Sequence, residues 1–141
     1  MLIKNKKFIF VSLIMLAFFI LDRVLKNLAL HGKILLIKNY NLALSININK
    51  FINNNIILFL YLIIFIFLIY FLIKNINNLK LFIAFNFLII GMVSNFLDKI
   101  KYNFVIDYIN FYFFYNNLAD MFIFIGMVLL IYKSIKINFK I

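Results

Sequence analysis

The sequence predicts an all-α membrane protein with four transmembrane helices. Hydrophobic residues make up 67% of the 141 residues and charged residues only 13%, and four long apolar segments alternate with polar connections. An average soluble domain is roughly 45–50% apolar and about 25% charged. A soluble fold of this length could not bury so much Phe, Ile and Leu. The composition therefore disfavours a soluble enzyme or DNA-binding domain, and it excludes a disordered chain.

The four apolar segments are close to the roughly 20 residues that a helix needs to cross a bilayer. The first, residues 8–28, follows a lysine cluster. It lacks a small-residue cleavage site and three further segments follow, so we interpret it as a retained anchor rather than a signal peptide. Residues 56–73 carry no charge, and residues 81–97 and 118–135 carry polar groups toward one end. We expect residues 1–141 to form a single integral membrane domain.

The number of spans places both termini on the same side of the membrane. Cations flank the spans on both sides in similar number, but the dense cluster Lys4, Lys6 and Lys7 favours cytoplasmic termini. The outer connections are then residues 29–55 and 99–117. In the first, residues 34–37 and 42–48 could pair as short strands. The second is rich in aromatic rings, which favour the lipid headgroup level.

The chemistry open to this chain is restricted by its composition. There is no Cys and one His, so a disulfide framework, a thiol nucleophile and a zinc-protease site are excluded. The net charge of +11 comes from lysines placed between apolar runs, which fits membrane flanks rather than a nucleic-acid surface. We expect no metal, no cofactor and no nucleic-acid partner, and we interpret His31 as a solvated loop residue.

The acids are only four: Asp22, Asp98, Asp107 and Asp120. All lie at the outer ends of spans or between the third and fourth spans, where a carboxylate is costly and indicates function. One such acid would be an ordinary solvated group, but four near the same surface are not. Asp22 and Lys26 can pair at i,i+4. Gly91, Asn95 and Asp98 form a helical stripe, which we interpret as mainly positional.

The remaining acids, Asp107 and Asp120, are candidates for a catalytic pair. Asn117 can cap a helix that places Asp120 in its first turn, where the helix dipole favours the anion. Two carboxyl groups meeting in a partly dry site share a proton, and such a pair can activate water and protonate a leaving group. We expect the shared proton to lie more often on Asp107. Tyr108 is expected to pack at the membrane interface.

These polar residues fall in five segments that resemble, in order, the motifs of the lipoprotein signal peptidase (signal peptidase II) family. Asp22–Lys26 resembles Asp-x-x-x-Lys, and Lys38–Ser45 resembles x-Asn-x-Gly-x-Ala-Phe-Ser. Gly91–Lys99 resembles Gly-x-x-Gly-Asn-x-x-Asp-Arg, Val105–Tyr108 resembles Val-x-Asp-Phe, and Asn117–Asp120 resembles Asn-x-Ala-Asp.

The resemblance implies a monomeric aspartic endopeptidase of the bacterial cytoplasmic membrane that acts on its extracytoplasmic side. It implies four spans, a small extracytoplasmic sheet from the first outer loop and an interfacial helix in the second. Its substrates would be prolipoproteins that carry diacylglycerol, cleaved before the lipid-modified cysteine. The catalytic pair maps to Asp107 and Asp120, and the supporting or substrate-binding residues are Asp22, Lys26, Asn39, Asn95, Lys99, Asn117 and Ala119.

The chain departs from the family pattern at four positions. Asn41 and Ser94 stand where the family has Gly, Leu44 where it has Phe, and Lys99 where it has Arg. Asn tolerates left-handed backbone, so Asn41 is compatible with a turn. Lys99 retains the charge but loses the planar fork of Arg. The segment from Asp107 to Asp120 is also shorter than is usual in the family.

Three other readings of the polar residues are open. An ion or proton carrier would need acids near the bilayer midplane, but these cluster at one end. A structural subunit would tolerate the substitutions Asp107→Asn and Asp120→Asn. A serine–lysine peptidase would use Ser45, which is more simply a loop hydroxyl bonded to nearby backbone.

Overall fold

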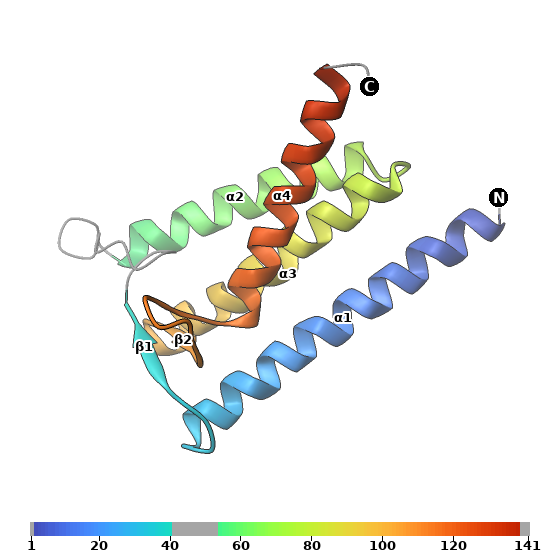
Figure 1. Ribbon diagram of the computed structural model, residues 1–141. Coiled ribbons are helices and arrows are strands. Elements are labelled where there is room, and N and C mark those ends of the chain that lie inside the picture. Colours follow the sequence, from blue (N-terminus) through green and yellow to red (C-terminus); the bar gives the residue numbers. More distant parts are fainter. Residues whose placement is uncertain (1, 41–53, 139–141) are drawn as a thin grey trace.

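The computed structural model describes residues 2–40 and 54–138, which form four long helices and two small sheets (Figure 1). The helices are α1 (Leu2–Leu30), α2 (Asn54–Lys74), α3 (Leu79–Tyr102) and α4 (Leu118–Asn138), and each contains a segment long and apolar enough to cross a membrane. Both termini and the α2–α3 turn lie at one end of the bundle, and the strands lie at the other. The four expected membrane helices are therefore present.

The ends of the helices are set by asparagines. Asn78 precedes α3, and its side-chain oxygen accepts a hydrogen bond from the Leu81 N–H at 3.3 Å. Asn103 ends α3 with φ +64°, a left-handed conformation that Asn adopts more readily than most residues. Asn117 precedes α4 and accepts a hydrogen bond from the Asp120 N–H at 2.9 Å, as the sequence predicted. Both α3 and α4 therefore have a fixed end beside the strands.

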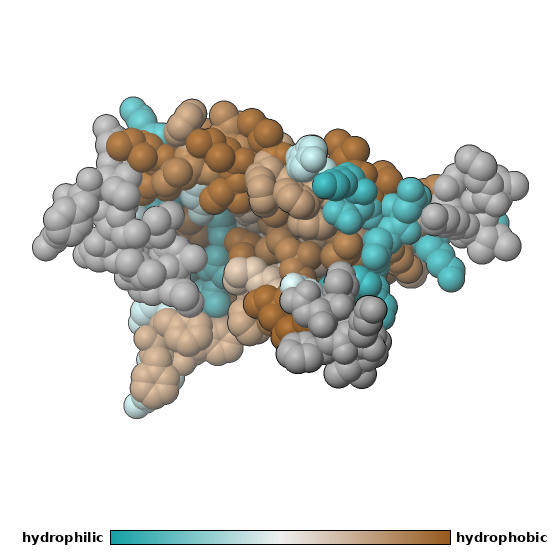
Figure 2. All heavy atoms as spheres, turned by 90° about the horizontal axis from the view of Figure 1, so that it is seen from above, coloured by the Kyte–Doolittle hydropathy of each residue, from teal (hydrophilic) through white to brown (hydrophobic). Residues whose placement is uncertain are grey.

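The central helix of the bundle is α3, which packs against the other three helices. Half of its most apolar 18-residue window is buried, whereas the corresponding share is 11% in α1, 11% in α2 and 17% in α4. Hydrophobic side chains cover most of the surface of the helices that is in view in Figure 2. A bundle that exposes so much apolar surface suits lipid rather than water.

Two glycines allow α3 and α4 to pack closely. A Cβ atom on Gly91 would overlap the carbonyl oxygen of Ala119 in α4, and one on Gly126 would lie 2.9 Å from the Ala84 carbonyl oxygen in α3. Small residues are the usual means by which membrane helices approach each other. Gly91 therefore sets the distance between α3 and the first turn of α4.

The strands connect the two outer segments to each other. β1 (Ile37–Asn39) pairs antiparallel with β2 (Val105–Asp107), with Ile37 opposite Asp107. The first outer loop therefore contributes a strand to a sheet, but this strand begins only at the last residue of the expected range 34–37 and pairs with the second outer segment. The second expected strand, residues 42–48, lies outside the described residues, as do Asn41, Leu44 and Ser45.

The second outer segment contains a β-hairpin where the resemblance implied an interfacial helix. β3 (Ile109–Asn110) pairs with β4 (Tyr115–Asn116), and no helix occurs in residues 103–117. The physical reason is composition, because Val, Ile, Tyr and Phe fit a pleated strand better than a helix. The segment is also too short for a long helix and two flanking turns.

Candidate active site

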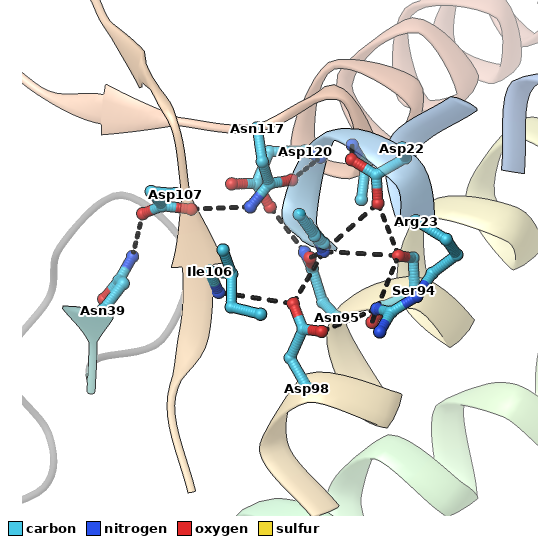
Figure 3. A network of polar contacts seen from close by, with 12 residues as sticks. Asp22, Arg23, Asn39, Ser94, Asn95, Asp98, Ile106, Asp107, Asn117 and Asp120 are labelled. Atoms are coloured by element: carbon cyan, nitrogen blue, oxygen red, sulfur yellow. Dashed lines mark hydrogen bonds and ion pairs between the residues drawn. The ribbon is translucent and has the colours of Figure 1, made fainter. Parts of the chain in front are cut away.

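A buried polar cluster lies where α1, α3, α4 and β2 meet (Figure 3). Eight polar or charged residues are buried in the described part of the chain: Asp22, Lys26, Ser94, Asn95, Asp98, Lys99, Asp107 and Asn117. Every buried side-chain nitrogen or oxygen described has a hydrogen-bond partner. Such complete pairing is needed in an apolar bundle, where an unpaired polar group is expensive.

Asp107, the last residue of β2, is buried between two amide side chains. Asn39 Nδ2 donates to its Oδ2 at 2.9 Å, and Asn117 Nδ2 donates to its Oδ1 at 2.6 Å. Burial raises the pKa of Asp107 above its ordinary value, while the two amide hydrogen bonds and the charge of Lys26 act in the opposite direction. Asp107 therefore keeps a proton at a higher pH than a solvated aspartate does.

Asp120 lies in the first turn of α4 and is less buried than Asp107. Its Oδ1 accepts a hydrogen bond from Asn95 Nδ2 at 2.7 Å. Asn117 lies between the two aspartates (Figure 3), because its amide nitrogen binds the Asp107 carboxylate and its oxygen binds the Asp120 N–H. The two carboxylates are also near enough for their charges to repel each other. The structure thus brings the two predicted acids into one cluster.

Asp22 and Lys26, one turn apart on α1, connect this pair to the rest of the bundle. The Asp22 carboxylate accepts hydrogen bonds from the Tyr108 hydroxyl at 2.7 Å and from the Ala119 N–H at 3.2 Å. Lys26 Nζ lies 3.2 Å from Asp22 Oδ2, as the i,i+4 spacing predicted. It also donates to Asn95 Oδ1 at 2.8 Å, which turns the Asn95 amide nitrogen toward Asp120. Lys26 therefore orients Asn95, which in turn holds Asp120.

Asp98 binds more groups than the mainly positional role of the helical stripe implied. Its carboxylate lies 2.6 Å from Arg23 Nη1 and 2.8 Å from Lys26 Nζ. It also accepts a hydrogen bond from the N–H of Ile106, the residue before Asp107, at 3.2 Å. Asp98 thus holds β2 and two cations of α1, Arg23 and Lys26, in place. Arg23 is a site residue that the sequence pattern did not single out.

Ser94 and Tyr108 are two further residues of the cluster that the sequence reading missed. Ser94 Oγ donates to Asp22 at 2.5 Å and accepts from Lys26 at 3.2 Å. Its place three residues after Gly91 and four before Asp98 on the same helix face was a usable signal. Tyr108 was expected at the interface, but its hydroxyl binds Asp22 and accepts from the Leu118 N–H at 3.1 Å. Burial and the nearby Asp22 charge raise the Tyr108 pKa, so the phenol stays protonated.

Lys99 lies beside the aspartate cluster and binds the first outer connection. Its buried Nζ donates to the Tyr40 carbonyl oxygen at 2.7 Å, just after β1. His31 is exposed, and its ring nitrogen lies 2.8 Å from the Asn27 carbonyl oxygen. Within residues 2–40 and 54–138, no group of three or more His, Cys, Asp or Glu side chains could hold a metal ion.

Comparisons with known proteins agree with this arrangement. Residues 13–136 match the family model described as Signal peptidase (SPase) II, which covers most of the chain. The chain belongs to the signal peptidase II family. A solved bacterial membrane enzyme, determined by the in meso method at 2.3 Å resolution, superposes with a TM-score of 0.80 at 27% identity over 89% of this chain and 87% of that one. A second bacterial membrane enzyme, at 1.9 Å resolution, gives a TM-score of 0.77.

Curated lipoprotein signal peptidases match shorter stretches. The protein of Shewanella amazonensis is 38% identical over 67 residues, which are 43% of this chain and 39% of that protein. The protein of Buchnera aphidicola is 37% identical over 57 residues, which are 37% of this chain and 36% of that protein. Each match spans less than half of the relative. Family membership and the four apolar helices make the chain a multi-pass membrane protein of a bacterial family.

Proposed function

We propose that this chain is a membrane aspartic endopeptidase that removes signal peptides from diacylglyceryl-modified prolipoproteins, cleaving immediately before the lipid-modified cysteine. The observation that carries the proposal is the pair Asp107 and Asp120, joined by Asn117 at one end of an apolar bundle. Membership of the signal peptidase II family supports the substrate class. Asp22, Lys26, Asn39, Asn95, Lys99, Asn117 and Ala119 are proposed to support the site or to bind substrate.

Asp120 and Asp107 take different parts in the proposed reaction. Asp120 lies at a helix N-terminus, which favours its anion, and it is the more exposed of the two, so it accepts a proton from the attacking water. Asp107 is the proposed acid: burial raises its pKa above that of a solvated aspartate, and it donates its proton to the leaving amide nitrogen. The water oxygen bonds to the scissile carbonyl carbon, and the C–N bond then breaks. A pair of this kind titrates as a unit.

We propose that the described chain acts as a single domain and as a monomer, with its termini in the cytoplasm and the two sheets outside. Asp107 ends β2 and Asp120 lies in the first turn of α4. Both elements meet at the strand end of the bundle, opposite the termini (Figure 1), which fits chemistry at the outer membrane surface. Reporter fusions at Ile141 and Asn53 test the orientation. An extracytoplasmic signal from Ile141 would contradict both the topology and the position of the site.

The activity is tested with the purified protein in lipid and a diacylglyceryl-modified prolipoprotein, with the unlipidated precursor as the substrate control. Asp107→Asn and Asp120→Asn are each expected to lower the cleavage rate by several orders of magnitude, because either the base or the acid is lost. Lys80→Gln is the control, since it removes an exposed charge at the opposite end of α3. Near-full cleavage by Asp120→Asn would leave the structural-subunit reading in place.

A further inference from the structure

The β3–β4 hairpin carries the most exposed aromatic side chains of the described chain. Tyr112 and Phe113 at its tip are each 90% exposed, and Phe111, Phe114 and Tyr115 are 42–43% exposed. Large aromatic side chains each bring about 150–250 Å² of surface, which costs free energy when it stays in water. An apolar tip of this kind indicates a surface that contacts another apolar medium.

The tip is held in this exposed conformation by its own hydrogen bonds. Tyr112 has φ +66°, an unusual conformation for a bulky residue, and its N–H donates to Asn110 Oδ1 at 2.8 Å. The Phe111 N–H donates to the Phe114 carbonyl oxygen at 3.0 Å, and the rings of these two residues stack with centroids 5.4 Å apart. The hairpin is therefore built so that its two tip rings point away from the protein rather than fold onto it.

The position of the hairpin identifies the medium. It follows β2 in the connection between α3 and α4, so it lies at the end of the bundle where α3 ends and α4 begins. Exposed apolar residues at the end of α3, Leu97 and Ile100, continue the lipid-facing surface of the bundle up to this level. Tyr and Phe rings favour the boundary between hydrocarbon and headgroups. Exposed apolar residues therefore extend along α3 to the end of the bundle from which this outer segment leaves.

The charges at this end of the bundle determine which lipid headgroups the surface attracts. The four aspartates are all taken up in the polar cluster, where none is fully exposed. The exposed charges of the described outer segments are therefore cations: Lys33, Lys38 and Lys101. Cations at the level of the headgroups are attracted to an anionic membrane surface. This outer surface suits anionic headgroups better than zwitterionic ones.

The hairpin is also connected directly to the polar cluster. β3 follows Asp107 and Tyr108, and β4 runs into Asn117. The Tyr108 N–H donates to the Asn116 carbonyl oxygen at 3.1 Å, which closes the base of the hairpin beside the Tyr108–Asp22 hydrogen bond. The position of the hairpin tip is therefore coupled to the segment that carries Asp107 and to the start of α4.

We propose that residues 109–116 form an aromatic anchor that inserts into the headgroup region of an anionic bilayer and holds β2 and the first turn of α4 at the membrane surface. The bound partner is the lipid surface itself. The proposal does not depend on the proposed peptidase activity, although it specifies how the membrane would hold the two aspartates in place.

The chain contains no Trp, so Phe113→Trp introduces a single tryptophan at the tip of the hairpin. The full-length variant is placed in phosphatidylcholine vesicles with brominated acyl chains, with and without phosphatidylglycerol, and its fluorescence quenching is measured. Phe124→Trp, on the exposed face of α4, is the reference inside the bilayer, and His31→Trp is the reference in an exposed polar turn.

We expect brominated lipid to quench Phe113→Trp far more than His31→Trp, and phosphatidylglycerol to increase quenching at position 113 but not at position 124. Quenching equal to that of His31→Trp, with full access to iodide in water, would overturn the anchor. So would shielding that depends on the protein-to-lipid ratio, which indicates a second copy, or quenching that appears only with lipidated substrate. Equal quenching with and without phosphatidylglycerol would overturn the preference for anionic lipid. Cleavage by the same variant is measured separately, so a failed anchor and a failed peptidase proposal are distinguishable.

Discussion

α2 and α3 are neighbours of similar length, yet they have different tasks. α2 has a mean hydropathy of 3.3 in its most apolar window and buries 11% of that window, whereas α3 has 1.8 and buries 50%. α3 buries Ser94, Asn95, Asp98 and Lys99 toward its C-terminal end, and these side chains bind groups of α1, α4 and the outer segments. The apolar side chains of α2 can face lipid directly, but the polar side chains of α3 need hydrogen-bond partners from other elements. α2 therefore serves mainly as a membrane-spanning segment, whereas α3 also positions the polar residues of the cluster.

Lys26→Met is expected to have the largest effect on the α3 side of this comparison. Lys26 is fully buried and pairs with both Asp22 and Asp98, so its loss removes the cation paired with Asp22 and leaves Asp98 with Arg23 alone. Breaking a buried ion pair on one side costs about 3–5 kcal/mol. Thermal unfolding in detergent measures the loss. An unchanged unfolding temperature would show that the cluster does not stabilise the bundle.

Gly91→Ala tests the close approach of α3 and α4. The added methyl group would overlap the Ala119 carbonyl oxygen, which is backbone and cannot rotate away. Overpacking costs about 1–3 kcal/mol, and here it also displaces the turn that carries Asp120. We expect cleavage to fall more than stability. Ala84→Ser, on the same helix but away from the cluster, controls for a general disturbance of α3.

Ser94→Ala removes the hydroxyl that stands where the family pattern has glycine. Asp22 then loses a hydrogen bond of 2.5 Å but keeps Tyr108 and Lys26, so neither charge is orphaned. The expected cost is therefore only about 1 kcal/mol, the usual net value of one hydrogen bond. Unfolding measurements on Ser94→Ala and Ser94→Gly distinguish loss of the hydroxyl from the flexibility of glycine. A stabilised Ser94→Ala would contradict the assignment.

Asn39→Leu is expected to change the pH dependence of cleavage. The Asn39 amide lowers the pKa of Asp107 against the larger effect of burial, so its removal raises that pKa further. If Asp107 must hold the proton, activity declines as pH rises through its pKa. The alkaline limb of the pH–rate profile should have a midpoint above the ordinary aspartate pKa of about 3.9, and this midpoint should move to still higher pH in the variant. A shift to lower pH would refute this role for Asp107.

Ile66→Ala, on the lipid-facing side of α2, is expected to have the smallest effect. Ile66 is 61% exposed, so lipid replaces the lost side chain and no protein cavity forms. We expect a change within about 0.5 kcal/mol, the usual range for a surface position, and unchanged cleavage. A loss as large as that of Ser94→Ala would remove the distinction between α2 and α3.

The helices could be predicted from the sequence because a bilayer places the same constraint on every transmembrane segment. Long apolar runs must be helical in a bilayer, so their positions follow from composition. The polar residues at the ends of α1, α3 and α4 could be singled out for the same reason, because a carboxylate near lipid is costly and indicates a functional or structural role. The spacing of Asp22 and Lys26 and the cap at Asn117 also follow from local helix geometry.

The outer segments could not be read in the same way. The pairing of β1 with β2 joins residues far apart in the sequence, and no local pattern specifies that partner. The Tyr108 hydroxyl reaches Asp22 across the fold, so its neighbours in the sequence give no hint of the contact. Aromatic residues serve equally well in an interfacial helix and in a hairpin. Within the segment, only the β-branched and aromatic enrichment around Ile109 favours the strand.

The ion pairs of Arg23 and Lys26 with Asp98 have a consequence for biosynthesis. They join α1 to α3, so these charges can neutralise one another as soon as the third helix has been made. Asp107, Asn117 and Asp120 come from later segments, and the Ala119 N–H reaches Asp22 only when the fourth helix is in place. A nascent chain therefore assembles its charged framework first and acquires both members of the carboxylate pair last. The proposed catalytic pair is therefore incomplete until the final helix enters the membrane.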